Sequence, residues 1–271
     1  MELTKFKTIL LDADGVLWIS DYPIPGINPF FDFLVENGIN WALLTNNSTR
    51  TTQDYIDKLG KFGISANSNS VFTSSSTTAE YLLERFGRGA PLHVIGMDGL
   101  TKTLIDAGFQ ISIGEENPEK EVVAVVAGMD RQINHQKIKI AMRLIMNGAA
   151  FIATNTDGSF PTPEGINPGT GMVIGALQFT SGVEPYVAGK PHPAIFETAL
   201  KALGSSPEET LMVGDRLETD ILGANLLGIK TIAVLTGVTS RVEINQSDIK
   251  PDYVYQDIAA VHQALIRAYT S

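Results

Sequence analysis

Short apolar runs rich in β-branched residues recur along the chain, each followed by a longer segment whose apolar positions have helical spacing. Each run ends at Gly, Asp, Asn or Thr. This alternation predicts a parallel sheet covered by helices, an α/β fold. The expected strands are 8–11, 41–45, 71–73, 92–95, 122–127, 151–154, 186–188, 211–213 and 231–235. The expected helices are 29–37, 52–62, 77–86, 136–146, 171–181, 193–203, 219–227 and 258–269.

Nine strands are too many for one small sheet, and 271 residues exceed a typical domain of about 100–150 residues. Two Gly-containing stretches, 86–91 and 182–185, interrupt the pattern and are expected to act as hinges. The chain is therefore expected to begin one sheet, form a second α/β unit, and return to complete the first. We place the first domain at residues 1–87 and 187–271, and the inserted domain at 88–186.

Composition narrows the classes of partner. With 44% hydrophobic and 18% charged residues and a mean hydropathy of +0.07, the chain is typical of globular proteins with substantial cores. The net charge of −10, without any Lys/Arg cluster, argues against nucleic acid as a partner. A phosphate site on so acidic a protein must supply its own local positive charge.

The chain has no cysteine, which excludes disulfides, thiolate metal sites and thiol catalysis. Its apolar runs are of strand length, far below the roughly 20 residues of a membrane span. The first residues contain no apolar region as long as that of a signal peptide. We expect a cytoplasmic protein that does not bind a membrane.

The first candidate for chemistry is a pair of carboxylates, Asp12 and Asp14, directly after the first expected strand. Ligands bind at this carboxyl edge in open α/β folds. Two carboxylates so close raise each other's pKa unless a cation compensates them, and Mg²⁺ prefers such oxygen ligands. The alternative is a turn or helix cap without a metal.

A second acidic motif follows another apolar strand, where Asp215 comes directly after Gly214 and Asp220 follows at the start of a helix. The Asp215 carboxylate would complete a Mg²⁺ site with the Asp12 carboxylate and the backbone carbonyl of Asp14. Asp220 is either a supporting or direct metal ligand, or an acidic residue favoured by the helix dipole.

The strand 41–45 ends in Thr45, Asn46, Asn47 and Ser48, ahead of a helix. The backbone N–H groups of a helix N-terminus favour phosphate. Thr45 and Asn46 would bind phosphate oxygens through a hydroxyl and a backbone amide, and Asn47 is a further substrate-binding candidate. Alternatively, Asn47 or Ser48 only caps the helix.

Lys190 lies between two apolar segments and is followed by Pro191, which restricts its backbone to extended conformations. It is our candidate for neutralising phosphate charge, against the alternative of an ordinary solvated lysine. We expect His192 to be a surface residue and not a catalyst.

Together these segments resemble the four motifs of the haloacid dehalogenase-like superfamily, in the same order and over nearly the whole chain. They are Asp12-x-Asp14-Gly15-Val16, Thr45-Asn46-Asn47, Gly189-Lys190-Pro191 and Gly214-Asp215-x4-Asp220. The residues of the segments Leu-Thr-Asn-Asn-Ser and Gly-Lys-Pro are similar to those in the motifs of the NagD or 4-nitrophenylphosphatase subfamily.

The resemblance implies a Rossmann-like core with an α/β cap inserted between the second and third motifs. It implies Asp12 as nucleophile, Asp14 as general acid and then base, Lys190 as charge neutraliser, and Asp215 as Mg²⁺ ligand supported by Asp220. Thr45 and Asn46 would bind phosphate. Family members also commonly form homodimers.

The expected function is Mg²⁺-dependent hydrolysis of small phosphate monoesters such as sugar phosphates, nucleotides and 4-nitrophenyl phosphate, through an aspartyl-phosphate intermediate. Cap residues 155–158 and 161–171 are candidates for the substrate-facing edge, or else are ordinary turns. A phosphotransferase of the same superfamily and a non-enzymatic phosphate-binding protein remain alternatives. A dehalogenase is disfavoured by Asp14 and Asp215, a receiver module by the chain length, and a dinucleotide enzyme by the absence of Gly-x-Gly-x-x-Gly.

Overall fold

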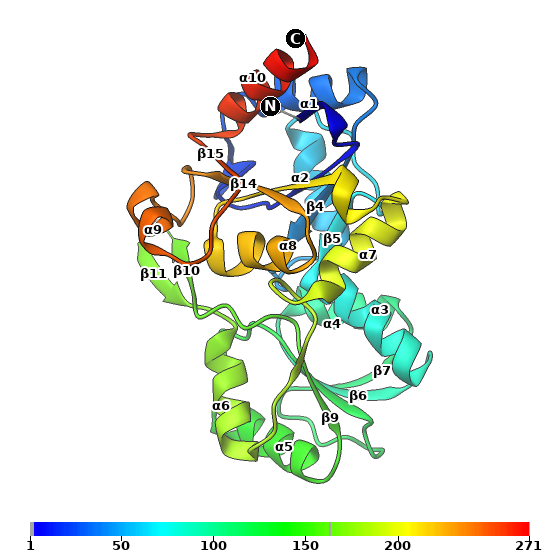
Figure 1. Ribbon diagram of the computed structural model, residues 1–271. Helices are drawn as coiled ribbons and strands as arrows, with labels where there is room; N and C mark the ends of the chain where they lie inside the picture. Colours follow the sequence, from blue (N-terminus) through cyan, green and yellow to red (C-terminus); the bar gives the residue numbers. More distant parts are fainter. Residues whose placement is uncertain (1–2, 163, 271) are drawn as a thin grey trace. The chain divides into compact units, whose positions relative to one another are not determined.

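The computed structural model describes residues 3–162 and 164–270. The chain forms two compact units (Figure 1). The first unit comprises Met1–Thr45, Tyr55–Phe72 and Lys190–Ser271, and the second comprises Asn46–Asp54 and Thr73–Gly189. The inserted domain expected at 88–186 lies within the second unit, which also contains 46–54, 73–87 and 187–189.

The first unit is built on a six-stranded sheet with the strand order β15-β14-β13-β1-β4-β5. Numbered along the chain, these strands follow the order 6-5-4-1-2-3, which is the order of a Rossmann fold. β1 pairs in parallel with both β4 and β13, and β14 and β15 extend the sheet in parallel beyond β13. The bounds are β1 Thr8–Leu11, β4 Asn40–Thr45, β5 Val71–Thr73, β13 Thr210–Gly214, β14 Lys230–Val234 and β15 Tyr253–Tyr255.

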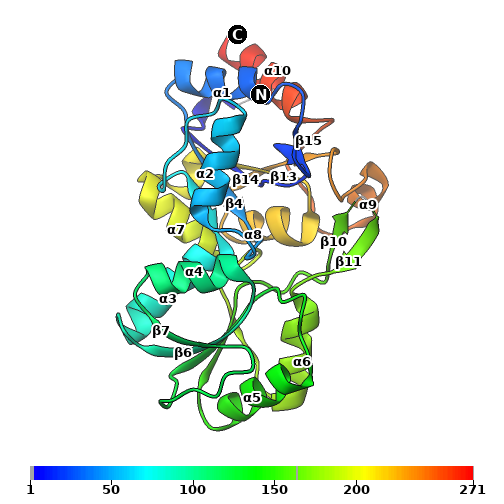
Figure 2. The ribbon, with the colours of Figure 1, turned by 180° about the vertical axis from the view of Figure 1, so that it is seen from behind.

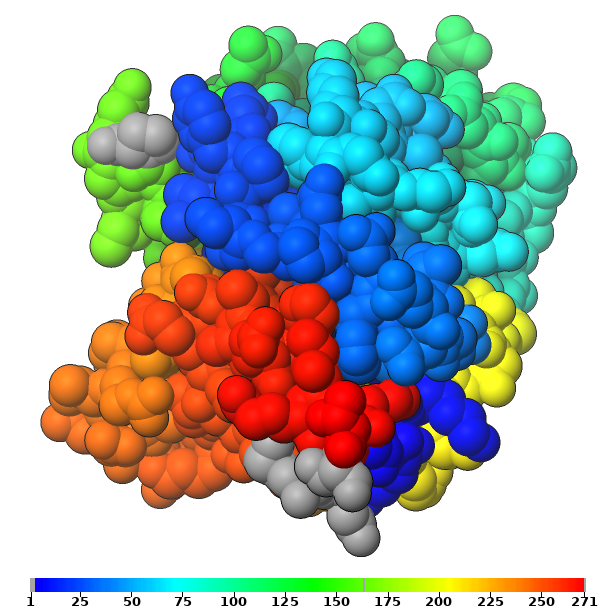
Figure 3. Space-filling model, turned by 90° about the horizontal axis from the view of Figure 1, so that it is seen from above, coloured from blue at the N-terminus to red at the C-terminus, as the bar shows by residue number. Residues whose placement is uncertain are grey.

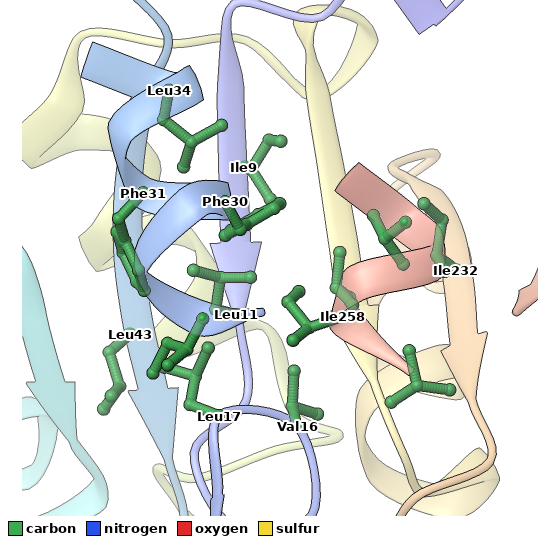
Figure 4. Close-up of a cluster of buried hydrophobic side chains, with 14 of the residues drawn as sticks. Ile9, Leu11, Val16, Leu17, Phe30, Phe31, Leu34, Leu43, Ile232 and Ile258 are labelled. Carbon is green, nitrogen blue, oxygen red and sulfur yellow. The ribbon is translucent and has the colours of Figure 1, made fainter. Parts of the chain in front are cut away.

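Helices cover both faces of this sheet because successive strand residues point to opposite sides. Ile9 and Leu11 pack with α1 (Ile27–Glu36), α2 (Thr52–Lys61) and α10 (Ile258–Tyr269), a cluster shown in Figure 4. Leu10 faces the other side, toward α7 (Pro193–Leu203) and α8 (Leu222–Leu226). Figure 2 shows α1 and α2 from the first of these sides, and Figure 3 shows α10 in red beside α1 in blue. Each fully buried leucine contributes about 1.5–3 kcal/mol to this packing.

The second unit repeats the same architecture with a five-stranded parallel sheet. Its order, β12-β9-β8-β6-β7, is the 2-1-3-4-5 order of flavodoxin-like sheets read from the other edge. Two helices pack on each face, α3 with α4 and α5 with α6. The bounds are β6 Pro91–Ile95, β7 Gln110–Ile113, β8 Ala124–Ala127, β9 Ala150–Ala153, β12 Tyr186–Val187, α3 Ser74–Phe86, α4 Asp98–Asp106, α5 His135–Met146 and α6 Gly171–Ser181.

Two small hairpins and several short helical segments complete the described chain. The first hairpin pairs β2 with β3 directly after the Asp12 motif, and the second pairs β10 with β11 in the second unit. Their bounds are β2 Trp18–Ile19, β3 Tyr22–Pro23, β10 Ser159–Thr162 and β11 Gly165–Pro168. The short helical segments are η1 Leu3–Lys5, η2 Pro207–Glu209, η3 Leu217–Ile221 and α9 Arg241–Gln246.

The predicted α/β class with a parallel-sheet core is confirmed. All nine expected strands are present within a few residues, and the helices expected at 171–181, 193–203 and 258–269 have those bounds. The helix expected at 219–227 is instead a π-type turn, η3, that continues into α8. Sequence analysis missed α4, α9, β7, β15 and both hairpins. Among residues 3–162 and 164–270, no helix is both long and apolar enough to cross a bilayer.

Candidate active site

The predicted nucleophile lies at the point where the strand order of the first sheet changes direction. Leu11, the last residue of β1, pairs with Leu43 of β4 and with Val213 of β13. The backbone N–H of the next residue, Asp12, donates to the Val213 carbonyl at 2.9 Å. β1 and β13 are consecutive in space but not in the chain, and ligands of open α/β sheets bind beside such a switch point.

Lys190 is fully enclosed by acceptors at this edge. Its side chain is 2% exposed, and Nζ lies 2.5 Å from Oδ1 of Asp12 and 2.7 Å from Oδ1 of Asp220. It also donates to the Leu44 carbonyl at 2.8 Å, at the end of β4. Burial alone would lower the pKa of Lys190, but the carboxylates of Asp12 and Asp220 raise it above its ordinary value. The lysine is therefore a buried cation and not a solvated surface residue.

Asp215 is held in place by backbone groups from the loop after β14. Its Oδ2 accepts a hydrogen bond from the Val238 N–H at 2.7 Å. A Cβ atom on Gly237 would lie 1.8 Å from this oxygen, and one on Gly15, whose φ is +86°, would lie 2.6 Å from it. Both positions therefore require glycine. Burial and the charge of Asp220 raise the pKa of Asp215 to about 7, although the Val238 N–H opposes this change.

Asp220 is buried and both of its oxygens are in contact with donors. Oδ2 accepts from the backbone N–H groups of Asp215 at 3.2 Å and Arg216 at 3.1 Å, while Oδ1 contacts Lys190. The π-type turn, in which the Ile221 N–H donates to the Arg216 carbonyl, places this carboxylate back over the end of β13. Asp220 therefore accepts hydrogen bonds from backbone N–H groups that precede its own helical segment, and it also forms an ion pair with Lys190.

The carboxylates of Asp12, Asp215 and Asp220 form a cluster, in which one oxygen from each lies within 4.8 Å of the others. Burial raises the pKa of Asp12 well above its ordinary value; Lys190 counteracts this effect, and the charges of Asp220 and Asp215 add to it. The three carboxyl groups, of which Asp215 and Asp220 are buried and Asp12 is half-buried, outnumber the one ammonium that contacts them. An all-oxygen donor set of this kind fits a hard divalent cation.

Asp14 lies outside this cluster and is exposed. Its Oδ1 accepts a hydrogen bond from the indole Nε1 of Trp18 at 3.0 Å. The sequence predicts that a metal would bind the backbone carbonyl of Asp14. The position of the Asp14 carboxylate outside the cluster agrees with this prediction, since the carboxylate is not needed as a ligand.

The family described as Haloacid dehalogenase-like hydrolase matches residues 9–110, and the HAD-hydrolase-like family matches residues 187–261. The chain is 36% identical over 256 residues to the acid sugar phosphatase of Staphylococcus aureus, covering 94% of this chain and 96% of that protein. The chain belongs to the haloacid dehalogenase-like hydrolase family.

Two solved structures extend the similarity to the fold. The 4-nitrophenylphosphatase of Thermotoga maritima superposes with a TM-score of 0.88 at 34% identity, covering 96% of this chain and 98% of that one. The glycerol phosphate phosphatase of Mycobacterium tuberculosis, in complex with magnesium, superposes with a TM-score of 0.84 at 29% identity, covering 96% and 77%. The predicted resemblance to the NagD or 4-nitrophenylphosphatase subfamily is confirmed.

In this haloacid dehalogenase-like chain, the second motif lies at the boundary between the two units. Thr45 is buried at the end of β4 in the first unit, and Asn46 begins the second unit. Within the second unit, Asn46 Nδ2 donates to Oδ1 of Asp157 at 3.0 Å, and the Asn46 carbonyl accepts from Asn155 Nδ2 at 2.6 Å. The Ser74 hydroxyl donates to the same carbonyl at 2.7 Å. Asn46 is thus attached to the loop 155–158.

The alternative interpretation, that Asn47 or Ser48 caps the following helix, is wrong because α2 begins only at Thr52. Asn47 Oδ1 accepts instead from the backbone N–H of Thr49 at 2.9 Å, which closes a local turn. The helix α2 begins later, where Thr51 and Asp54 exchange hydrogen bonds between side chain and backbone. His192 is exposed, as expected for a surface residue.

The sequence did not predict a role for the loop 235–239, although this loop contacts Asp215. The Thr236 hydroxyl donates to the Gly15 carbonyl at 2.5 Å, and the Thr239 N–H donates to the Asp215 carbonyl at 3.1 Å. Its sequence signal was the Thr236-Gly237 pair, one residue beyond the end of β14. This resembles the small polar residues that end the other strands of the site.

Proposed function

We propose that this phosphatase hydrolyses small phosphate monoesters in a Mg²⁺-dependent reaction through a phosphoryl group on Asp12. Sugar phosphates, nucleotides and 4-nitrophenyl phosphate are the proposed substrates, and the names of the sugar, 4-nitrophenyl and glycerol phosphate phosphatases support this class. The observation that carries the proposal is the direct contact between Asp12 and a buried ammonium, beside two further carboxylates at the switch point.

In the first half-reaction, a carboxylate oxygen of Asp12 attacks phosphorus. The new bond joins Asp12 to the phosphoryl group, while the bond from phosphorus to the ester oxygen breaks. Asp14 gives a proton to the leaving oxygen, so the alcohol departs neutral. The exposed position of the Asp14 carboxylate, outside the cluster, supports this assignment.

In the second half-reaction, water attacks the phosphorus of aspartyl phosphate. Asp14, now a carboxylate, takes a proton from the water, and the Asp12–phosphorus bond breaks. Inorganic phosphate leaves, Asp12 recovers its carboxylate and Asp14 its proton. One residue thus serves as acid and then as base.

The donor set fits Mg²⁺, with the carboxylates of Asp12 and Asp215 and the backbone carbonyl of Asp14 as proposed ligands and Asp220 beside them. When bound, the cation supplies positive charge that stabilises the transferring phosphoryl group. Lys190 and two backbone N–H groups already contact the oxygens of Asp220. We therefore propose that Asp220 supports the site and is not one of the main metal ligands.

The remaining contacts to phosphate are assigned to Lys190 and the second motif. We propose that Lys190 neutralises phosphate charge, because its ammonium contacts the proposed nucleophile and phosphoryl transfer depends mainly on positioning and electrostatics. Thr45 and Asn46 are proposed to bind phosphate oxygens, with Asn47 as a further contact. The second unit is proposed to be the cap, and the loop 155–158 its specificity element, because Asp157 contacts Asn46 directly.

The test is phosphate release from 4-nitrophenyl phosphate, sugar phosphates and nucleotides, each with Mg²⁺ and with EDTA. Release that requires Mg²⁺ and ranks the esters supports the proposal. If added alcohols accept the phosphoryl group in place of water, the protein is a phosphotransferase. Equal release in EDTA would contradict the metal dependence.

A further inference from the structure

A buried tryptophan contacts the proposed general acid, and the reaction as described gives it no role. Trp18 is 0% exposed, and its indole N–H donates to Oδ1 of Asp14 at 3.0 Å. A buried indole N–H normally finds an acceptor. In this protein that acceptor is an exposed carboxylate.

The backbone between the two residues forms a closed turn that fixes their separation. The Gly15 N–H donates to the Trp18 carbonyl at 2.8 Å, and the Leu17 N–H donates to the Ala13 carbonyl at 3.0 Å. The positive φ of Gly15 permits this reversal of direction. This turn brings the side chain of Trp18 into contact with Asp14, which lies four residues earlier in the chain. Both residues follow soon after the proposed nucleophile, Asp12.

The indole ring is itself held by residues of the helix α2 and the segment that follows it. The ring of Tyr55 is stacked on it, with centroids 6.1 Å apart and planes inclined by 21°, and Phe62 lies 6.0 Å away. The ammonium of Lys58 lies over the indole, 4.3 Å from its centroid, and donates to the Ser20 carbonyl at 2.6 Å. Ser20 lies in the turn between β2 and β3, so Lys58 fastens the hairpin that carries Trp18.

We propose that Trp18 is a positioning residue for proton transfer by Asp14, with Lys58 and Tyr55 holding its ring. This inference rests on the proposed function, in which Asp14 protonates the leaving oxygen. An indole N–H only donates, so Oδ1 accepts from it and Oδ2 carries the proton that is transferred. The hydrogen bond keeps the carboxyl group in one orientation before substrate binds. Misplacing a reacting group by about 1 Å can cost on the order of 100-fold in rate.

The proposal makes a prediction that depends on the leaving group. An alkoxide is a poor leaving group and needs a proton as its bond to phosphorus breaks. The 4-nitrophenolate ion is a good leaving group and needs little help from an acid. Loss of the indole N–H should therefore harm an alkyl phosphate much more than 4-nitrophenyl phosphate. A general disturbance of the fold would harm both substrates alike.

The experiment compares kcat/KM for glycerol phosphate and for 4-nitrophenyl phosphate at saturating Mg²⁺, in the wild type and in Trp18→Phe. This ratio of constants reports the steps up to phosphorylation of the enzyme. Trp18→Phe keeps an aromatic ring against Tyr55 but removes the N–H donor. We expect a loss of about 10- to 100-fold on glycerol phosphate and less than about threefold on 4-nitrophenyl phosphate.

The chain offers a matched control in its second tryptophan, Trp41. It is half-buried and packs edge-on against Phe31, with ring centroids 4.7 Å apart. Trp41→Phe makes the same chemical change away from Asp14, and both substrates should keep their kcat/KM. Equal losses on both substrates in Trp18→Phe, or no loss on either, would overturn the proposal. An inactive wild type would instead overturn the proposed function.

Lys58→Met provides a second test that keeps the indole in place. The methionine side chain is similar in length but lacks both the charge over the ring and the donor to Ser20. We expect the same selective loss on glycerol phosphate, about three- to tenfold, as Trp18 loses its support. If Trp18→Phe does not fold, this variant decides the question, and unchanged selectivity would contradict the proposal.

Discussion

The two parallel sheets of this chain share an architecture and differ at their carboxyl edges. Both place helices on each face, and both contain a switch point where the strand order reverses. In the first sheet, the strands at the switch point lead into Asp12 and Asp215. In the second sheet, the corresponding strands β6 and β8 lead into Gly96 and Gly128. Only the first switch point carries carboxylates immediately beyond its strands.

The second edge is in contact with a segment of the same unit. The Met129 N–H, just beyond β8, donates to the Ser48 hydroxyl at 3.2 Å. A Cβ atom on Gly128 would lie 3.0 Å from that hydroxyl, and one on Gly99 would lie 2.4 Å from the Thr49 carbonyl carbon. The loop after β4 therefore packs where a ligand would bind in other folds of this order.

Sheet topology therefore determines where a functional site can form, and the side chains at that position determine its chemistry. Each unit also contains an ion pair of Asp and Lys in which one partner is buried and the other half-buried. Asp12 belongs to the carboxylate cluster, which Lys190 contacts. Asp130 and Lys137 are 2.7 Å apart, and Asp130 also accepts a hydrogen bond from the Gln132 N–H. We expect the first pair to serve catalysis and the second to serve stability.

The largest expected effect comes from Asp12→Asn. Removing the nucleophile should lower kcat by at least about a thousandfold. The variant also removes one of three crowded carboxylates, so its free energy of unfolding in EDTA should not fall. Phosphate release and urea unfolding measure the two effects, and activity near that of the wild type would contradict the assignment.

The matched variant is Asp130→Asn in the second unit. It weakens an ion pair whose two residues both belong to the second unit, so the free energy of unfolding should fall by about 2 kcal/mol. The kcat should remain within about threefold of wild type, because, among the residues that the structure describes, Asp130 shares no partner with the proposed catalytic residues and substitutions at such independent sites do not influence each other. A selective loss of activity would show that the second unit's pair also serves the chemistry.

A smaller effect is expected from Gly237→Ala. The added Cβ would meet Oδ2 of Asp215 at 1.8 Å and displace the carboxylate. The Mg²⁺ concentration that gives half-maximal activity should rise about 10- to 100-fold. The control is Gly175→Ala in α6, where nothing lies within 4 Å of the new Cβ. It should leave the Mg²⁺ requirement unchanged and raise stability by about 0.5–1 kcal/mol. Equal Mg²⁺ curves for both variants would refute the role of this loop.

The last expected effect appears only at acidic pH and concerns His93, which is buried in β6 of the second unit and contacts Ser112 through Nδ1 at 2.9 Å. Burial lowers the pKa of His93 to about 4 from its ordinary 6.5. The unfolded chain therefore binds a proton more readily between these values, so the folded state loses stability as pH falls from 6.5 toward 4. This contribution should reach about 2 kcal/mol at pH 5.

Urea unfolding at pH 7 and pH 5 measures this effect against His93→Asn, which retains a group at the position of Nδ1 but does not titrate. The wild type should lose about 2 kcal/mol more than the variant between the two pH values. Equal losses would show that another group causes the acid sensitivity.

The sequence predicted most of the fold because apolar runs and helical spacing report burial directly. The strand β1 and the helices α6, α7 and α10 have the expected bounds. The hairpin β10–β11 was missed because its apolar residues are few and mostly exposed or half-buried. The helix α4 was missed because Gly99 lies in its first turn, where contact with the Thr49 backbone requires it. Tertiary contacts decided these elements.

The site was predictable where its residues directly follow strands, as Asp12 and Asp215 do. Lys190 was also recognised, although its contacts with Asp220 and the Leu44 carbonyl depend on chain segments far apart in sequence. Trp18 and Gly237 belong to no recognisable motif. From the sequence alone, a tryptophan in an apolar segment predicts a core residue, and a glycine after a strand predicts a turn. Their roles depend on the distances to Asp14 and Asp215, which only the structure provides.

The most direct test of the account is the location of the covalent phosphoryl group. Wild-type enzyme turning over 4-nitrophenyl phosphate with Mg²⁺ would be quenched in acid, digested, and mapped by tandem mass spectrometry. The account predicts a phosphoryl group on Asp12 that is absent in EDTA and in Asp12→Asn. A phosphoryl group on another residue, or an Asp12→Asn variant that still turns over substrate at the wild-type rate, would contradict it.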